Sequence, residues 1–297
     1  MTPVRRRAAL GAGLLLAACT PQPAPRPEAR YVIGEPYSLG GVWSYPKEEF
    51  GRSETGLAAV LPDRRLGRRT ANGEIVDPRR LIGAHRTLQL PAIVAVTNLE
   101  NGRMLRLRVN DRGPEQAGRV IGLSARAAEL LGIPPGGTAQ VLLRVEDAPS
   151  RALARGLPSR ERPAVEVAAA PRAEVAAESL APLPGSRQAA PGRAVPRDAV
   201  APLAEAAAAL PPDPLPEAVG LGAPRPGRLL VEAGTFFRRD LAQRQAARIG
   251  GRVEAFGAGG QPQYRVRLGP FADVAAADRA VAAVLAAGLP EVKLLVE

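Results

Sequence analysis

The stretch AIVAVTNLENGRMLRLRVNDRGP, residues 92–114, decides the fold of the first half of the chain. Apolar and polar side chains alternate on both sides of Asn101-Gly102, and a period of two is typical of half-buried strands. Asn-Gly between two such runs is the strongest short-range signal for a β-hairpin. The second run ends in the turn-forming residues 110–114. We therefore expect a hairpin whose second strand places Asp111 at the rim of a sheet.

Further short strands surround this hairpin in the sequence. Residues 55–61 and 138–146 have strand-like patterns, and residues 123–133 form one short amphipathic helix. Ser124 is suited to cap the start of that helix, and Gly132 is suited to end it. Many short strands with a single helix are typical of a compact barrel. We place this domain at residues 37–147.

Residues 227–297 show a different order of elements. Strand and helix patterns follow one another as βαββαβ, which predicts a ferredoxin-like domain. VEAGTF, residues 231–236, matches VRLGPF, residues 266–271, in its Val, Gly and Phe, and each copy precedes a helix. Strand alternation places Arg265 and Arg267 on one face of the sheet, and the repeat places Glu232 on the same face.

Two segments lack the periodicity of folded elements. Residues 19–36 are rich in proline and predict an extended tether. Residues 148–226 consist mainly of Ala, Pro, Arg and Glu with few large hydrophobic residues, so we expect a disordered linker.

The N-terminus predicts export from the cytoplasm. Three arginines precede the apolar run from Ala8 to Ala18, which is too short to span a bilayer as a helix because about 20 residues are needed. Residues 1–18 have the pattern of a signal peptide. LAAC, residues 16–19, resembles the cleavage box of bacterial lipoproteins, which implies an acylated Cys19; the alternative is an ordinary signal peptide with a chance cysteine. We expect a periplasm-facing protein of the bacterial envelope, anchored to a membrane by lipid.

The composition limits the chemistry. Only one cysteine and one histidine are present, so we expect no intramolecular disulfide, no zinc site and no cofactor. The formal charge is +11, and removal of Arg5, Arg6 and Arg7 would lower it to +8. Aromatic residues are 3% of the chain, so the stacking platforms of nucleic-acid binders are nearly absent, and VRLGPF lacks the aromatic array of an RNA-recognition domain. We expect no nucleic-acid partner.

Four motifs resemble one family in order and spacing. They are RTANGE (69–74), AHRTLQLP (84–91), VTNLENGR (96–103) and VNDRGP (109–114). Together they resemble the rare lipoprotein A (RlpA) family, and residues 227–297 resemble the sporulation-related repeat (SPOR) domain. This resemblance implies a six-stranded double-psi β-barrel that acts as a lytic transglycosylase of septal peptidoglycan. It also implies a SPOR domain that binds glycan strands stripped of stem peptides and recruits the protein to division sites, with divisome proteins as further partners.

The resemblance also assigns candidate site residues. Glu74, His85 and Asp111 stand at the positions of the family's active site. The residues that we expect to contact the substrate are Thr70, Asn72, Asn110 and Arg112, and those that we expect to contact glycan in the SPOR domain are Glu232, Arg265 and Arg267. Three positions depart from the family pattern: Gly122 replaces an Asp, Glu232 replaces a common Gln, and WSYP (43–46) replaces WYG.

Each candidate has a plain structural alternative. Asp111 could donate a proton to the leaving sugar oxygen and then remove one from the muramyl 6-hydroxyl, or it could only hold its turn or pair with Arg112. Glu74 could tune Asp111 or be a solvated loop carboxylate. His85 could orient a carboxylate or contact sugar hydroxyls, or be a structural histidine.

Two functions remain open from the sequence. The first is an envelope enzyme that cleaves glycan strands. The second is a non-catalytic lipoprotein that binds or scaffolds peptidoglycan with an expansin-like barrel, and Gly122 is the residue that favours it.

Overall fold

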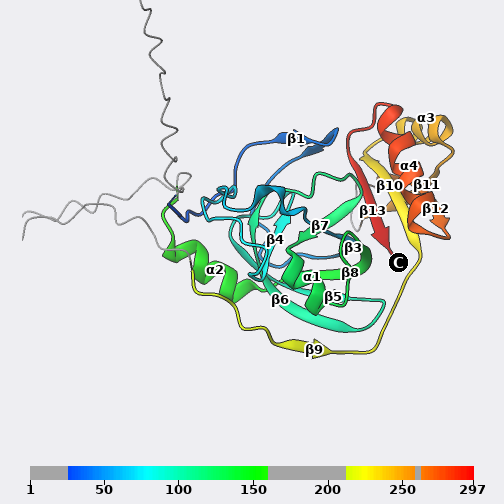
Figure 1. The fold of residues 1–297 in the computed structure, drawn as a ribbon. Coiled ribbons are helices and arrows are strands. Elements are labelled where there is room, and N and C mark those ends of the chain that lie inside the picture. Colours follow the sequence, from blue (N-terminus) through cyan, green and yellow to red (C-terminus); the bar gives the residue numbers. More distant parts are fainter. Residues whose placement is uncertain (1–25, 160–211, 258–261) are drawn as a thin grey trace, which may run out of the picture.

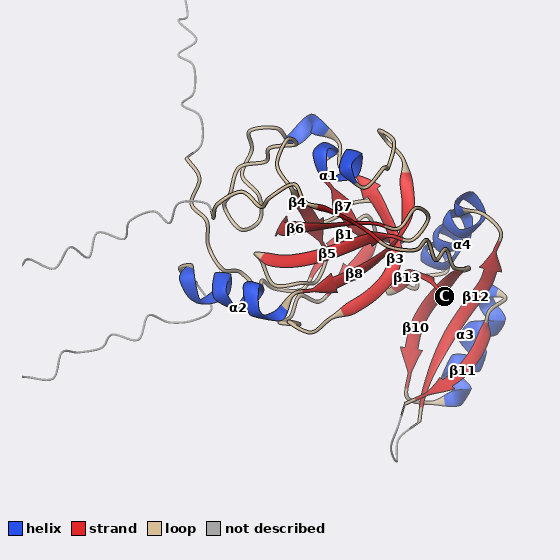
Figure 2. Ribbon diagram, turned by 90° about the horizontal axis from the view of Figure 1, so that it is seen from below, coloured by secondary structure: helices blue, strands red, loops and turns tan. Residues whose placement is uncertain are grey.

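The computed structural model describes residues 26–159, 212–257 and 262–297. The predicted signal peptide, Cys19 and residues 160–211 of the predicted linker lie outside the described residues. Two domains lie side by side: a barrel, and a twisted sheet that carries two helices on one face (Figures 1 and 2).

Six strands close into the first domain. Their order in the sheet is β4-β7-β3-β8-β5-β6, and pairing of β4 with β6 closes the barrel. Two pairs, β3–β7 and β4–β6, are parallel, and the other pairs of the barrel are antiparallel. The predicted six-stranded double-psi barrel is confirmed. The strands are β3 (Ser53–Val60), β4 (Ile82–His85), β5 (Ala92–Asn98), β6 (Arg103–Asp111), β7 (Arg119–Leu123) and β8 (Thr138–Val145).

The predicted hairpin is β5–β6, joined by residues 99–102. Ala92 pairs with Val109 in its register, and Asp111 is the last residue of β6. Leu105, Leu107 and Val109 are buried in the barrel core, as their alternation predicts. Arg108 departs from the alternation because its side chain is also buried. It forms an ion pair with Glu74.

Short elements complete the barrel. Helix α1 (Ala125–Leu130) begins after Ser124, whose Oγ accepts a hydrogen bond from Ala127 N, and Gly132 follows its end with a φ of 72°. A 3-10 helix, η1 (Asp63–Arg65), follows β3. A small hairpin of β1 (Tyr37–Leu39) and β2 (Val42–Ser44) extends from the barrel toward the second domain (Figure 1).

The start of the predicted linker is ordered, contrary to the sequence-based prediction. Residues 147–156 form helix α2. Ser150 is fully buried, and its Oγ accepts a hydrogen bond from Ile93 N at 3.0 Å. Ala154 packs with Tyr31 and Phe50 in a small cluster beside the barrel. Small residues mediate this packing, which explains why composition did not reveal the helix.

The end of the predicted linker is also ordered. Strand β9 (Val219–Leu221) pairs with β6, so residues 212–226 run along the barrel (Figure 1). Arg126 holds this segment through two hydrogen bonds to Glu217, at 2.9 and 2.6 Å. Part of the predicted tether is bound as well, because Tyr31 is buried and bridges to Ser159. Backbone pairing and ion pairs with the rest of the domain therefore hold segments that contain few large hydrophobic residues.

The second domain confirms the predicted βαββαβ order. Its strands pair as β11-β12-β10-β13, all antiparallel, and both helices cover one face (Figure 2). Glu232 lies opposite Arg267 in the register, so the two side chains share the other face, as predicted. The elements are β10 (Leu229–Phe236), α3 (Arg239–Ile249), β11 (Arg252–Phe256), β12 (Gln263–Phe271), α4 (Val274–Ala286) and β13 (Val292–Val296).

The two domains pack against each other along β13. Thr55 Oγ1 donates to Val296 O at 2.6 Å and accepts from Val296 N at 3.3 Å. The buried guanidinium of Arg119 makes two hydrogen bonds to Asp278 on α4, at 2.6 and 2.8 Å. A Cβ on Gly118, whose φ is 74°, would lie 3.2 Å from Val281, so a glycine allows the close approach of α4.

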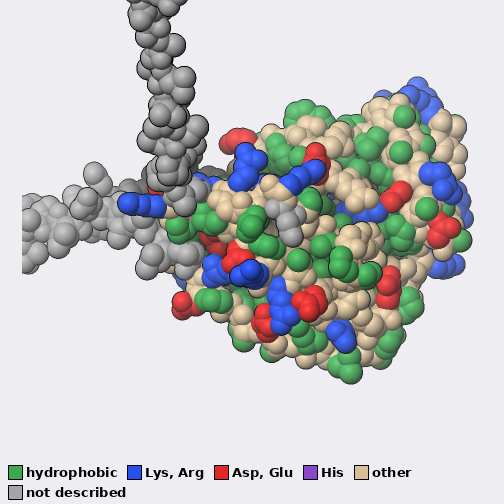
Figure 3. Space-filling model, in the orientation of Figure 1, with side chains coloured by type: hydrophobic (Ala, Val, Ile, Leu, Met, Phe, Trp, Pro, Cys, Tyr) green, Lys and Arg blue, Asp and Glu red, His purple; other side chains and the backbone are tan. Residues whose placement is uncertain are grey.

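The described surface shows no strong segregation of charge on the face in Figure 3, where basic and acidic side chains lie next to one another over the barrel. Among the described residues, no helix is long and apolar enough to cross a membrane.

Candidate active site

Asp111 lies at the rim of the barrel, where β6 ends. Its Oδ1 accepts hydrogen bonds from Ala71 N and Arg112 N, both at 2.9 Å, and its Oδ2 lies 2.6 Å from Arg65 Nη1. The Asp111 side chain is 10% exposed, whereas that of Arg65 is 43% exposed. The carboxylate therefore accepts backbone hydrogen bonds on its inner side and is covered on its outer side by a half-exposed arginine.

Glu74 is buried rather than solvated. Its Oε2 accepts hydrogen bonds from Arg108 Nη2 at 2.7 Å and Asn110 Nδ2 at 3.1 Å, and its Oε1 accepts one from Asn72 Nδ2 at 3.0 Å. Thr70 Oγ1 in turn donates to Asn72 Oδ1 at 2.8 Å. Asn72 and Asn110, which we expected to contact the substrate, thus bind Glu74 instead, and Thr70 binds Asn72.

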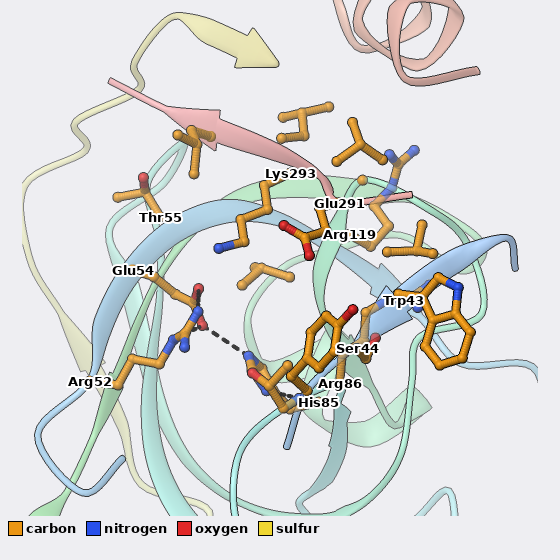
Figure 4. A pocket seen from close by; sticks show the side chains of 18 of the residues that line it. Trp43, Ser44, Arg52, Glu54, Thr55, His85, Arg86, Arg119, Glu291 and Lys293 are labelled. Atoms are coloured by element: carbon orange, nitrogen blue, oxygen red, sulfur yellow. Dashed lines mark hydrogen bonds and ion pairs between the residues drawn. The ribbon is translucent and has the colours of Figure 1, made fainter. Parts of the chain in front are cut away.

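His85 ends β4 and is bonded through both ring nitrogens. Nδ1 accepts from Thr87 N at 3.1 Å and Leu88 N at 3.0 Å, which assigns the proton of a neutral ring to Nε2. Nε2 lies 2.9 Å from Glu54 Oε1 (Figure 4). The ring therefore orients a carboxylate, and that carboxylate belongs to Glu54.

Glu54 is a site residue that sequence reasoning missed. Arg52 donates to both of its oxygens, at 2.8 and 2.6 Å. Burial by itself raises the pKa of the Glu54 carboxyl, but the hydrogen bonds and charges of His85 and Arg52 outweigh it and lower the pKa from 4.5 to about 2. The available signal was the spacing of Arg52 and Glu54, because residues two apart in a strand share one face.

The structure divides the three predicted catalytic residues between two places. Glu74 and Asp111 lie at one corner, joined through the 70–74 loop and Asn110. Ala84 pairs with Asp111, so His85 follows on the neighbouring strand, but its ring turns to Glu54.

Tyr37 is close enough to both places to bond to Arg86 and to feel the charge of Asp111. Its hydroxyl donates to Arg86 O at 2.8 Å. Burial raises the pKa of this hydroxyl, the charges of Arg112 and Arg86 oppose the rise, and the charge of Asp111 adds to it. Arg112 itself reaches inward, where Nη1 donates to Leu88 O at 2.5 Å. The predicted contact residue Arg112 is thus engaged with backbone carbonyl groups.

A pocket of about 270 Å³ lies over Glu54 and His85, between the two domains (Figure 4). The barrel and the β1–β2 hairpin form one side of it, and β13 with the residue before it forms the other. The residues that give it its chemical character are Trp43, Tyr45, Arg52, Glu54, His85, Arg86, Glu291 and Lys293.

Gly122 leaves a space that Leu61 fills. A Cβ on Gly122 would lie 2.4 Å from Leu61 Cδ2 and 2.9 Å from Leu61 Cγ. The aspartate that is usual at this position in the family therefore has no room here unless Leu61 moves.

The predicted glycan-binding face of the second domain is internally paired. Arg267 is buried and lies 3.5 Å from Glu232, 3.2 Å from Glu254 and 2.7 Å from Glu297. Arg265 lies 3.3 Å from Glu254, and its guanidinium stacks on the Phe256 ring. No group of three potential metal ligands occurs among the described residues.

Comparisons with known proteins identify the family. Residues 54–143 match the family described as "Lytic transglycolase", and residues 226–291 match the "SPOR domain" family. The Endolytic peptidoglycan transglycosylase RlpA of Pseudomonas aeruginosa is 34% identical over 258 residues, which cover 84% of this chain and 73% of that protein. The chain belongs to the RlpA family. This confirms the resemblance carried by the four motifs and the C-terminal repeat.

Other members of the RlpA family match over shorter lengths of the chain. The protein of the same name from Vibrio cholerae is 42% identical over 120 residues, covering 37% of this chain and 46% of that protein. The one from Yersinia pestis is 44% identical over 102 residues, covering 34% of this chain and 28% of that protein.

Proposed function

We propose that this chain is an endolytic transglycosylase that cleaves the glycan backbone of peptidoglycan and leaves 1,6-anhydromuramyl ends. The observation that carries the proposal is the relationship to the P. aeruginosa RlpA, which spans both domains at 34% identity. The SPOR domain supports a preference for strands without stem peptides and recruitment to the septal wall.

Asp111 is the acid and base of the proposed reaction. It donates a proton to the glycosidic oxygen as the bond to the anomeric carbon breaks, and it then removes the proton of the muramyl 6-hydroxyl. The 6-oxygen closes the anhydro ring, so the carboxyl recovers its proton and no water is consumed. Arg65 covers Asp111 and is half-exposed, so a bound glycan has to displace it.

Glu74 acts as a positioning residue in this proposal. Its carboxylate accepts hydrogen bonds from Asn72 and Asn110. Asn72 follows Ala71, whose N–H bonds to Asp111, and Asn110 directly precedes Asp111 in β6, so both bonds help to orient Asp111. His85 positions Glu54, whose carboxylate lines the pocket and is suited to stabilise a developing positive charge on a sugar ring.

Acylation of Cys19 would anchor the enzyme to a membrane on the periplasmic side, within reach of the wall. The apolar run before Cys19 and the proline-rich residues after it support this location. Divisome proteins are the partners that septal recruitment implies.

The second candidate function is a non-catalytic peptidoglycan-binding lipoprotein. Two observations favour it: Asp111 is surrounded by three donors, and Leu61 occupies the space of the family's usual aspartate at Gly122.

Incubation of the full chain with stem-peptide-free glycan, followed by mass spectrometry, distinguishes the two. We expect 1,6-anhydromuramyl ends from the wild type and from the control Asp77→Asn, because the Asp77 carboxylate accepts a hydrogen bond from Arg79 N in its own turn. Asp111→Asn should produce none while its binding to cell wall is unchanged. If the wild type also produces none, the enzyme proposal is wrong. If Asp111→Asn cleaves as the wild type does, the assigned role of Asp111 is wrong.

A further inference from the structure

A row of charged side chains crosses the open face of the C-terminal sheet and ends at the pocket. Glu232 on β10 pairs in register with Arg267 on one side and with Lys293 on the other. Residues directly opposite each other in antiparallel strands project to the same face. Lys293 is therefore the last member of the row, on the edge strand that packs against the barrel.

The barrel holds both ends of β13 and so fixes the place of Lys293. Trp43 N donates to Pro290 O at 3.2 Å before the strand, and Thr55 exchanges two hydrogen bonds with Val296 at its end. Figure 4 shows the Lys293 ammonium group directed into the pocket, on the side of Glu54.

Two cations from different domains line this pocket without carboxylate partners. Lys293 is exposed and has no ion pair or hydrogen bond among the described residues. Within the described part of the chain, Arg86 donates only to backbone carbonyl groups, to Leu39 O at 2.9 Å and Glu115 O at 3.1 Å. Burial lowers the pKa of the Arg86 guanidinium, and the charge of Tyr37 opposes this shift. Glu291 lines the same pocket and pairs with neither cation.

The rest of the lining suits a sugar. The rings of Trp43 and Tyr45 stack with centroids 6.5 Å apart and remain 47% and 52% exposed, so they offer flat apolar faces with polar edges. The volume of about 270 Å³ lies below the ~300–1,000 Å³ of sites for drug-sized ligands, which fits one sugar unit better than a length of chain.

We propose that this pocket, which exists only while the two domains are docked, binds one muramyl unit whose lactyl carboxylate is free, through Lys293 and Arg86. The inference rests on the proposed function for its substrate. Removal of a stem peptide converts the lactyl amide into a carboxylate, so a strand without stem peptides carries one anion on each muramyl unit. A cationic pocket therefore distinguishes stripped from substituted strands by charge. The SPOR domain then contributes to glycan binding at the Glu54–His85 face of the barrel as well as to recruitment.

The chain contains a single tryptophan, so the fluorescence of Trp43 reports on this pocket directly. The experiment titrates the full chain with a stem-peptide-free muramyl oligosaccharide and with the same oligosaccharide after conversion of its lactyl carboxyl to a methylamide. Calorimetry measures the affinity in parallel. We expect the fluorescence to change with the carboxylate form, and we expect the methylamide to bind about tenfold more weakly, as the loss of one charge-assisted contact implies.

Lys293→Ala should weaken binding of the carboxylate form about tenfold and leave binding of the methylamide unchanged, and Lys293→Arg should restore the difference. Arg279→Ala, which removes an exposed cation from helix α4 of the same domain, is the matched control and should bind both forms as the wild type does. Equal affinity of the wild type for the two forms, a Lys293→Ala variant that still discriminates, or saturation by calorimetry without a change in Trp43 fluorescence would each overturn the inference.

Counting anhydromuramyl ends on the same samples separates this inference from the proposed function. Discrimination by charge without any cleavage contradicts the transglycosylase proposal alone. Cleavage without an effect of Lys293 on discrimination contradicts the pocket assignment alone.

Discussion

His85 Nε2 and Glu54 Oε1 lie 2.9 Å apart although their strands, β4 and β3, are separated in the sheet by β7. The two side chains meet over the intervening strand β7, and both of them line the pocket. Because backbone N–H groups hold the other ring nitrogen of His85, the imidazole has a single orientation, and Glu54 is fixed with it.

Ionisation of Glu54 should make the stability of the barrel depend on pH. Its pKa in the folded protein is lowered to about 2 from 4.5, so the ionised form stabilises the fold above about pH 4.5, and this contribution is lost as the pH falls toward 2. A shift of this size corresponds to roughly 3 kcal/mol. Urea unfolding at pH 6 and pH 3 should show Glu54→Gln to be less stable than the wild type at pH 6, with a much smaller difference at pH 3. Glu129→Gln, at an exposed helix position, is the control, and an equal deficit of Glu54→Gln at both pH values would contradict the assignment.

Leu61 and Gly122 should behave as a coupled pair. Gly122→Asp restores the residue that is usual in the family, but its Cβ would lie 2.4 Å from Leu61 Cδ2. Overpacking of this kind costs about 1–3 kcal/mol. The double variant Leu61→Ala/Gly122→Asp should recover part of that loss, which thermal unfolding of the four members of a double-mutant cycle measures. Additive effects would show that Leu61 does not exclude the aspartate.

Local patterns in the sequence predicted the long elements of the fold. The β5–β6 hairpin, helix α1 with its Ser124 cap, and the βαββαβ order of the second domain follow from alternation, capping and turn residues. Strand β4 has four residues, all buried, and so lacks the alternation that reveals a strand. Helix α2 and strand β9 are stabilised by contacts with the barrel, which composition alone does not encode.

The candidate site could be predicted only in part for the same reason. The motifs placed Asp111 at the end of a strand, which the structure confirms. Side-chain direction was not accessible: His85 turns to a residue 31 positions earlier, and Arg108 turns inward to Glu74. The pocket over Glu54 is formed partly by Lys293, and no pattern within either domain predicts how the two domains dock.

Asp278 should hold the two domains together. Its carboxylate accepts two hydrogen bonds from Arg119, whose side chain is 2% exposed, whereas that of Asp278 is 36% exposed. Asp278→Ala leaves a buried cation without its partner, at a cost that we expect to be about 1–3 kcal/mol because solvent reaches the carboxylate. Separation of the domains should break the hydrogen bond between Trp43 N and Pro290 O and expose the segments around it, so limited proteolysis and Trp43 fluorescence should both change. Asp240→Ala, which removes an exposed carboxylate of α3, should change neither, and an Asp278→Ala variant indistinguishable from it would contradict the prediction.

Substitution of Glu74 should mainly lower stability, whereas substitution of Asp111 should mainly abolish cleavage. The side chains of Glu74 and Arg108 are 2% and 3% exposed, and removing one partner of a buried ion pair typically costs about 3–5 kcal/mol. Glu74→Gln should therefore lower the free energy of unfolding by that order, and Glu74→Leu/Arg108→Leu should recover much of the loss, since no unpaired charge remains buried. Asp111→Asn removes a contact with a half-exposed arginine, which is worth about 1 kcal/mol or less, while abolishing cleavage. Chemical denaturation alongside the cleavage assay tests both. A Glu74→Gln variant with wild-type stability but no activity would instead place Glu74 in the proton transfer itself.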